Sequence, residues 1–174
     1  MKHTVGVVMD NKPGVLSRIS ALLARRGFNI DSITAGPTRN HDVTRMTVVV
    51  EGDEYVADQA AKEMSKLEDV LKIERLSFRE STLREIMLIK VKAAKEERGE
   101  IVDLAKIMDC KIVDISPGTL MLEHSDTPEK IDLLVNLLSS YEILDMARGG
   151  AIALNTGEED EYIFRMTAGK TENK

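Results

Sequence analysis

The segment that decides the fold is residues 9–36, which read MDNKPGVLSRISALLARRGFNIDSITAG. An apolar run at residues 4–9 predicts a strand, and the polar turn at residues 10–14 follows it. Pro13 near the start of the next periodic segment and Gly27 at its end are typical of the two ends of a helix. A second strand is predicted from residue 28 onward. The helix between them has one apolar stripe, formed by Val15, Leu16, Ile19, Leu22 and Leu23.

The start of this helix is a candidate binding site for an anion. Free N–H groups at a helix N-terminus and the positive end of the helix dipole favour a ligand such as a carboxylate. Gly14 has no Cβ, so the backbone can approach that ligand closely. Asn11 and Asn29 stand at the two ends of the unit, and each side chain offers a donor and an acceptor. Local chemistry alone favours a plainer interpretation, in which Asn11 caps the helix and Gly14 and Asn29 serve turns.

The composition of the 174-residue chain is that of a soluble globular protein, with 43% hydrophobic and 31% charged residues. A formal net charge of −6, few aromatic residues and no Trp argue against nucleic-acid binding. A single cysteine, Cys110, excludes an intramolecular disulfide and suits a reducing compartment. We find no signal segment and no apolar run of membrane-spanning length, so we expect a cytoplasmic protein.

The first half of the chain reads strand, helix, strand, strand, helix, strand. Alternating apolar residues at 43–51 predict the third strand, and helical spacing predicts a helix from residue 54 to about Glu68. The fourth strand is expected at residues 70–78. Its apolar positions change phase between Ile73 and Leu76, which predicts a bulge or bend there.

The same order of elements recurs about 80 residues further on. Strands are predicted at 86–91, 111–115, 118–123 and 143–147, with helices at 97–109 and from Thr127 onward, where Thr is the expected N-cap and Pro128 the first residue. The fold class is therefore α+β, with two tandem ferredoxin-like βαββαβ units. We expect domains at residues 1–79 and 84–155, followed by a polar tail at 156–174.

No catalytic constellation is found. The three histidines (His3, His41 and His124) are scattered, and none stands at helical spacing from another His or Cys, so a metal site is unsupported. There is no nucleophile elbow, P-loop or dinucleotide fingerprint. Acylphosphatase shares the predicted fold, but this chain lacks the Gly-rich, Arg-bearing anion loop after its first strand. We therefore expect no catalytic site on this chain.

Several motifs occur together, and the similarity that they indicate covers about residues 2–155. Their order makes them specific, although each alone is weak. The chain resembles the regulatory (small) subunits of acetolactate synthase, also called acetohydroxyacid synthase, whose N-terminal part is an amino-acid-binding ACT domain. The motifs that carry the resemblance are Asn11-x-x-Gly14-x-Leu16-Ser17-Arg18, the segments at residues 26–34 and 36–38, Arg45-Met46-Thr47, the segment at 84–91, and Ala147-Arg148-Gly149.

The resemblance implies that this chain raises the activity of a separate catalytic subunit and makes it sensitive to valine. It implies a homodimer, paired through ACT domains, with effector sites at the interface. Thiamine diphosphate, Mg²⁺ and FAD would belong to the catalytic subunit, and this chain would carry no cofactor. The effector-site residues that it implies are Asn11, Gly14, Val15, Leu16, Asn29, Ile30, Ala35 and Gly36.

Two points stay open at this stage. The family often has Ala where this chain has Gly36, and one methylene is worth about 1–3 kcal/mol of discrimination, so the preferred branched-chain amino acid is undecided. The second unit lacks an Asn-x-x-Gly turn after its first strand, and we expect it to serve dimer contacts and coupling. An alternative is a stand-alone tandem-ACT sensor that regulates transcription or another biosynthetic enzyme.

Overall fold

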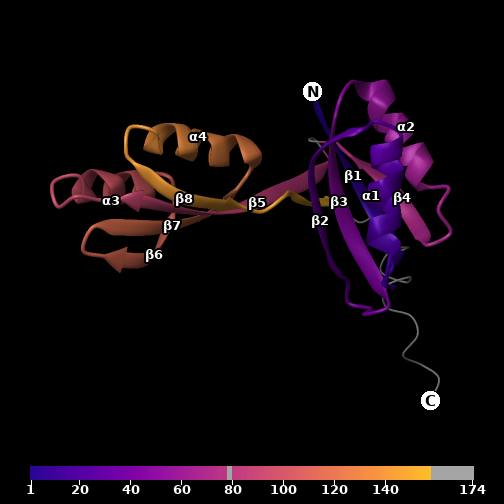
Figure 1. Cartoon of the computed structure of the whole chain (residues 1–174), viewed down its shortest axis with the longest axis horizontal. Coiled ribbons are helices and arrows are strands. Elements are labelled where there is room, and N and C mark those ends of the chain that lie inside the picture. The colour runs from indigo at the N-terminus through magenta and orange to yellow at the C-terminus, as the bar shows by residue number, and fades with distance from the viewer. Residues whose placement is uncertain (78–79, 158–174) are drawn as a thin grey trace, which may run out of the picture. The chain divides into compact units, whose positions relative to one another are not determined.

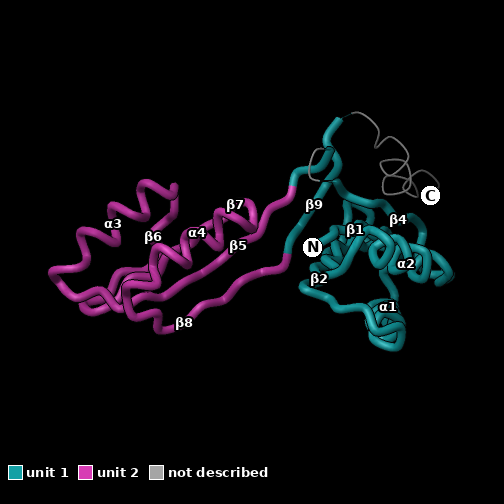
Figure 2. Tube along the Cα trace, turned by 90° about the horizontal axis from the view of Figure 1, so that it is seen from above, with its two compact units in different colours: residues 1–82, 151–174 teal, residues 83–150 magenta. Residues whose placement is uncertain are grey.

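The computed structural model describes residues 1–77 and 80–157. The chain forms two compact units, shown in different colours in Figure 2. Unit 1 contains residues 1–82 together with the segment from 151 onward, and unit 2 contains residues 83–150. Each unit is described by itself below.

Unit 1 is a four-stranded antiparallel sheet with strand order β2-β3-β1-β4. Two helices cover one face of this sheet (Figure 1). This is the ferredoxin-like arrangement that the sequence pattern predicts, and that expectation is confirmed. The elements are β1 (Lys2–Asp10), α1 (Val15–Arg25), β2 (Asn29–Pro37), β3 (Val43–Glu51), α2 (Glu54–Met64) and β4 (Val70–Leu76).

The core of unit 1 lies between the sheet and its helices. Alternate residues of the central strands face the helices, which is why their apolar positions repeat with a period of two. The helices contribute the apolar stripe expected from their spacing, although Leu16 of that stripe is exposed. The fully buried members are Val5, Val7, Ile19, Leu23, Met46, Val48, Ala60 and Met64.

Two boundaries in unit 1 differ from the prediction. Helix α2 ends at Met64 rather than near Glu68, because the N–H groups of Lys66 and Leu67 bond three residues back and tighten the chain into a turn. Strand β4 ends at Leu76, whereas residue 78 lies outside the described residues.

The expected bulge between Ile73 and Leu76 is wrong. The register between β1 and β4 shifts near the start of β4, where Val8 pairs with Lys72 but Met9 pairs with Val70. The apolar residues of β4 change from one face of the strand to the other because both faces are partly buried. Ile73 packs toward the helices, while Leu76 is buried on the opposite face.

Unit 2 repeats the topology, with strands in the order β6-β7-β5-β8. Thr127 is at the N-cap position of its second helix and Pro128 begins that helix, but the Thr127 side chain makes no capping hydrogen bond. Helices α3 and α4 enclose a second core that contains Met87, Ile89 and Leu134. The elements are β5 (Ser81–Lys92), α3 (Arg98–Ile107), β6 (Lys111–Ser116), β7 (Thr119–Asp126), α4 (Pro128–Leu138) and β8 (Ile143–Arg148).

The chain returns from unit 2 to unit 1 through one further strand, β9 (Ile152–Asn155). Ala151 and Ala153 are buried, and the backbone N–H of Ala153 donates a hydrogen bond to Thr47 Oγ1 of β3 at 3.3 Å. The expected second domain ran to residue 155, whereas residues 151–155 pack with unit 1. Of the expected tail at 156–174, only residues 156 and 157 are described.

Candidate effector site

The N-terminus of α1 has no side-chain cap. Its N-cap residue is Gly14, in the left-handed region at φ 85°, and the first turn holds no acidic side chain. Helix α2 differs, because Asp53 caps it by accepting a hydrogen bond from the Val56 N–H at 2.9 Å. The N–H groups in the first turn of α1 are therefore free to bind an external anion, whereas the Asp53 carboxylate already occupies this position in α2.

Two cations stand near this turn, and each is paired with an acid. Arg18 forms an ion pair with Asp69 at 2.5 Å, and Lys12 forms one with Asp10 at 2.5 Å. The hydrogen bond from Lys12 to Asp10 raises the pKa of the lysine. A Cβ added at Gly14 would come within 3.3 Å of Arg18 Nη1. Each cation near the turn is thus neutralised by an acid, and Arg18 lies close to Gly14.

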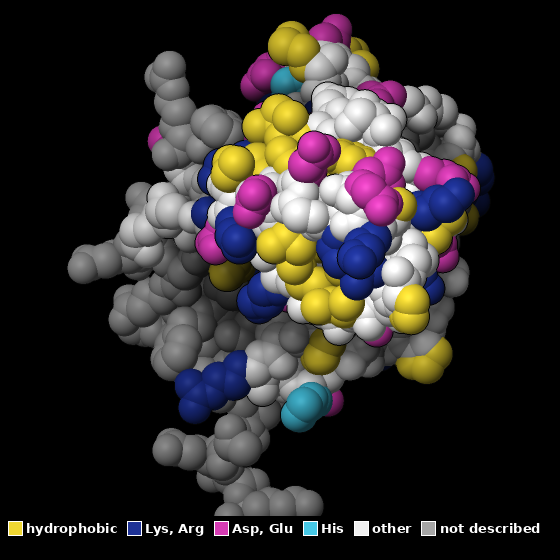
Figure 3. Space-filling view, turned by 90° about the vertical axis from the view of Figure 1, so that its left-hand side faces the viewer, with side chains coloured by type: hydrophobic (Ala, Val, Ile, Leu, Met, Phe, Trp, Pro, Cys, Tyr) yellow, Lys and Arg dark blue, Asp and Glu magenta, His cyan; other side chains and the backbone are white. Residues whose placement is uncertain are grey.

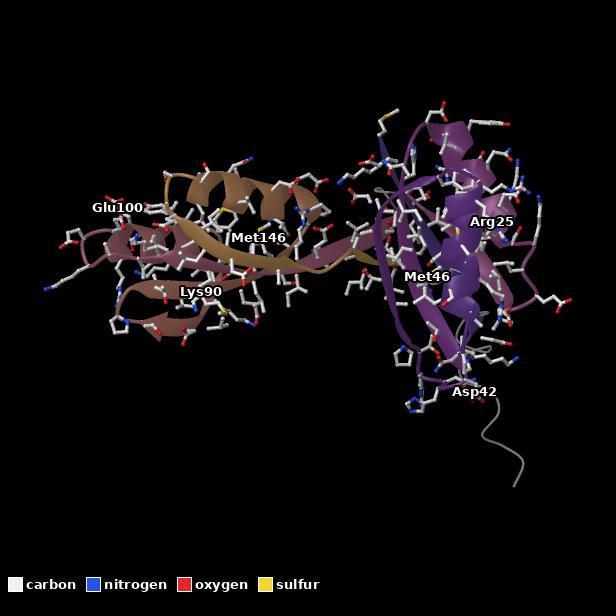
Figure 4. The ribbon with its side chains drawn as sticks, viewed as in Figure 1. Arg25, Asp42, Met46, Lys90, Glu100 and Met146 are labelled. Carbon is white, nitrogen blue, oxygen red and sulfur yellow. The ribbon has the colours of Figure 1, made fainter. Side chains whose placement is uncertain are left out.

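Asn11 does not cap the helix. Its backbone N–H donates to the Asp42 carbonyl at 2.8 Å, and its side-chain Nδ2 donates to the His41 carbonyl at 2.7 Å. Both bonds tie the β1–α1 turn to the β2–β3 turn. Figure 4 shows Asp42 at one end of unit 1 and Arg25, the last residue of α1, away from that end. With Nδ2 engaged, Asn11 offers its Oδ1 as an acceptor toward a ligand.

The expected site residues fall into two groups at opposite ends of the sheet. Gly36 pairs with Arg45 near the end of β1 that leads to Asn11, and both Ala35 and Gly36 are exposed. Asn29 pairs with Glu51, which in turn pairs with Lys2 at the start of β1. A nine-residue strand rising about 3.3 Å per residue separates these ends by about 26 Å. Within a single copy, Asn11, Gly14, Val15, Leu16, Ala35 and Gly36 therefore lie toward one end of the sheet, and Asn29 and Ile30 lie toward the other.

The apolar members differ in what they can offer a ligand. Val15 is 2% exposed and belongs to the core, so it supports the site from below. Leu16 is 43% exposed beside the uncapped turn and can contact a ligand directly. Ile30 is half-buried at the other end of β2.

The structure also identifies polar neighbours that the sequence interpretation missed. Asn29 Nδ2 donates to the Glu51 carboxylate, and Lys2 forms an ion pair with Asp31 at 2.7 Å beside them. Glu51 is the last residue of β3, and the pairing of β2 with β3 places it opposite Asn29. The alternation of β3 could have suggested this pairing, but the register between the two strands was needed to identify the partner.

Strand β2 is at an edge of the unit 1 sheet. It pairs with β3 on one side, and within residues 1–77 and 80–157 no strand pairs with its other side. Its backbone groups on that side are available to a further strand. Asn29, Ile30, Ala35 and Gly36 lie on this edge strand, whereas the other expected site residues lie in the turn after β1 and at the start of α1.

The part of the chain that the structure describes contains no group of three or more His, Cys, Asp or Glu side chains placed to hold a metal ion. In the same residues, no helix is long and apolar enough to cross a membrane.

Burial raises the pKa of the Cys110 thiol to about 11, so this cysteine is a poor nucleophile at neutral pH.

Comparisons with known proteins agree with this architecture. Residues 5–72 match the model of the acetohydroxyacid synthase small subunit-like ACT domain, and residues 84–157 match the model of the small subunit of acetolactate synthase. A probable acetolactate synthase small subunit from Archaeoglobus fulgidus is 42% identical over 159 residues, which cover 91% of this chain and 99% of that protein. An acetolactate synthase small subunit from Mycolicibacterium smegmatis is 39% identical, with 89% and 91% of the two chains covered.

A solved structure extends the comparison to the fold. The crystal structure of the acetolactate synthase small subunit from Thermotoga maritima superposes with a TM-score of 0.84 at 34% identity, covering 91% of this chain and 99% of that one. Similarity of sequence and fold thus extends over both units and nearly the full length of each relative. On this evidence the chain belongs to the acetolactate synthase small-subunit family.

Proposed function

We propose that this chain is a regulatory subunit that activates the catalytic subunit of acetolactate synthase and confers feedback inhibition by valine. Membership of the small-subunit family supports a non-catalytic, regulatory role. The observations that support the effector assignment are the uncapped N-terminus of α1 and the open edge strand β2 of the same sheet.

Valine is a zwitterion with a short branched side chain, and the described groups match its parts. The free N–H groups of the first turn of α1 would bind its carboxylate. The Oδ1 atoms of Asn11 and Asn29 would accept from its ammonium group, since the Nδ2 atoms of both are engaged elsewhere. The exposed side chain of Leu16, together with Ile30, would contact its isopropyl group.

A second copy of the chain would complete this site. Antiparallel pairing of β2 with β2 of another copy about a two-fold axis at Ile33 would set Asn29 of one copy opposite Pro37 of the other. The Asn29–Ile30 end of one copy would then lie beside the Asn11–Gly36 end of the other. The dimer would hold two equivalent sites and would cover both open β2 edges.

The size of the ligand bounds the affinity. Valine has few non-hydrogen atoms, and after the costs of ordering and desolvation a Kd between about 1 μM and 1 mM is expected. Such an affinity suits the sensing of a metabolite pool in branched-chain amino acid biosynthesis. Which of valine, leucine and isoleucine binds most tightly depends on the space beside Gly36, where no described atom lies within 4 Å of an added Cβ.

Regulation would follow from the placement of the effector between two copies. Binding there would favour one relative placement of the ACT units, and the catalytic subunit would respond to that change. The coupling must be reciprocal, so binding of the catalytic subunit should alter the affinity for valine. Thiamine diphosphate, Mg²⁺ and FAD would be held by the catalytic subunit.

The alternative is a stand-alone sensor that controls transcription or another biosynthetic enzyme. On the face of the molecule in Figure 3, basic and acidic side chains are interspersed and form no extended basic patch. This distribution and the net charge of −6 count against direct binding to DNA. Co-purification with a thiamine-diphosphate enzyme would distinguish the two functions.

The test is acetolactate formation by a purified catalytic subunit, with and without this chain, across a valine titration. We expect stimulation that valine reverses, and a valine-resistant complex with Asn29→Ala. Asn136→Ala, an exposed position on α4, is the matched control and should respond as the native chain does. Stimulation without valine sensitivity would refute the effector site, and no stimulation by folded protein would favour the stand-alone sensor.

A further inference from the structure

The sheet of unit 1 has a second face, away from its helices, and the chain itself covers part of it. Strand β9 lies on this face with Ala151 and Ala153 buried. Its alternate residues, Ile152 and Leu154, are more than half exposed. Figure 2 shows β9 beside β1 and in the colour of unit 1. We define this segment, residues 151–156, as the strap.

One straight row of residues connects the strap to the strand of the effector site. On the helix-free face, Thr34 of β2 pairs with Thr47 of β3, and Thr47 pairs with Gly6 of β1. Directly paired residues of neighbouring antiparallel strands contact each other on one face. Thr47 is 4% exposed, and its Oγ1 accepts the hydrogen bond of the Ala153 N–H. Thr34 is next to Ala35, an expected site residue.

Strand β9 pairs with β5, and beyond that pairing the strap is attached to the sheet of unit 1 by few contacts. The contacts that favour its attachment are the burial of two small side chains, the Thr47 bond, and a hydrogen bond from the Thr156 N–H to the Glu80 carbonyl at 2.7 Å. On the same face of the sheet, Ser32 Oγ and Thr34 Oγ1 are buried and have no hydrogen-bond partner among the described residues. A buried hydroxyl without a partner would be more stable if it were hydrated. These two hydroxyls therefore oppose the covering of this face by the strap.

We infer that residues 151–156 form a releasable strap, that Thr47 is the residue that positions it, and that its attachment is linked to the state of β2. The strap directly follows unit 2 in the chain, since the second of the two connections between the units runs through Gly150 and Ala151. A change in the position of β2 would alter the contact between Thr34 and Thr47. Because Thr47 accepts the hydrogen bond of the strap, the attachment of the strap would change as well. By reciprocity, release of the strap would loosen β2. Only the use of this linkage by an effector rests on the proposed function.

The test is hydrogen–deuterium exchange of the full chain, followed by mass spectrometry without any ligand. Thr47→Val keeps the shape of the side chain but removes the acceptor. We expect exchange of the strap to rise about tenfold and exchange of β2 to rise two- to threefold, while α2 and α4 stay unchanged. Thr47→Ser keeps a hydroxyl acceptor and should match the native chain.

A second pair of variants perturbs the strap itself. Ala153→Glu places a long charged side chain against the sheet, and it should raise exchange in β2 as Thr47→Val does. Leu154→Glu changes the exposed side of the same strand and is the matched control, expected to leave β2 unchanged. The inference would be overturned if Thr47→Val and Ala153→Glu raised hydrogen–deuterium exchange in the strap but not in β2, or if neither variant raised exchange in the strap. A valine titration by calorimetry on the native chain tests the proposed function separately.

Discussion

The most demanding prediction concerns the ion pair between Arg45 and Glu74 on the helix-free face of unit 1. The two side chains are only 16% and 7% exposed, and they lie 3.1 Å apart. Lys72 forms a second ion pair with Glu74. We predict that Glu74→Gln strongly destabilises unit 1, because it leaves the buried guanidinium of Arg45 without its counter-charge.

The magnitude follows from the burial of the pair. Breaking a buried pair from one side costs about 3–5 kcal/mol, because the remaining charge has lost its water and its partner. With a urea m-value of about 1.5 kcal/mol/M, the midpoint of unit 1 should fall by about 2–3 M. Replacing both residues, as in Arg45→Met with Glu74→Met, should recover most of the loss, since the buried guanidinium and its counter-charge are removed together and Lys72, the other partner of Glu74, is 28% exposed to water.

The assay is pulsed hydrogen–deuterium exchange across a urea series, which reports β1 and β3 separately from β5 and β7. This separation matters because a chain with two units need not unfold in one transition. Glu142→Gln is the matched control, since it breaks an exposed pair with Lys92 and should leave both midpoints unchanged. The reasoning is refuted if Glu74→Gln lowers the urea midpoint of unit 1 no more than Glu142→Gln does.

Three further predictions follow from local geometry. Gly14→Ala forces a Cβ into a left-handed conformation at a cost of about 1–2 kcal/mol and should lower the melting temperature of unit 1 by about 5–10 °C, whereas Gly36→Ala has open space and should not. Asp53→Ala removes the cap of α2 and should cost about 1 kcal/mol by urea unfolding; an equal effect of Thr127→Ala, whose side chain makes no capping bond, would contradict this. Because the pKa of Cys110 is raised from 9.0 to about 11, its thiolate population at pH 8 is about a hundredfold lower than that of an unperturbed thiol, and its reaction with an aromatic disulfide reagent should be slower in proportion. Labelling as fast as that of a small free thiol would contradict the assigned burial.

Most of the fold could be predicted because each element carries its own periodicity. Alternation in β3 and the stripe of α1 predicted both elements and the faces that they bury. The prediction was wrong where two faces of one strand are buried, as in β4, because Ile73 and Leu76 then serve different layers and mimic a bulge. The end of α2 was also misplaced, since Leu67 still packs on the core from a turn beyond the helix.

The candidate site was predictable only in its chemistry. The Asn11 to Leu16 turn was found because glycine and proline placed at a helix start are visible in the sequence. The side-chain bond of Asn11 to His41 and that of Asn29 to Glu51 were not visible, because they join residues 30 and 22 positions apart. Their discovery needed the register of the sheet.

The sequence by itself determined the two βαββαβ units, most of their helix-facing residues and the glycine turn before α1, since these follow from local spacing and the conformational freedom of single residues, whereas the missing side-chain cap of α1 was seen only in the structure. Only the tertiary structure decided that Asn11 and Asn29 lie at opposite ends of the sheet and that residues 151–155 return to unit 1. Both facts depend on which strands pair and in which register. Such pairing is set by the sum of many long-range contacts, which no short segment of the chain encodes.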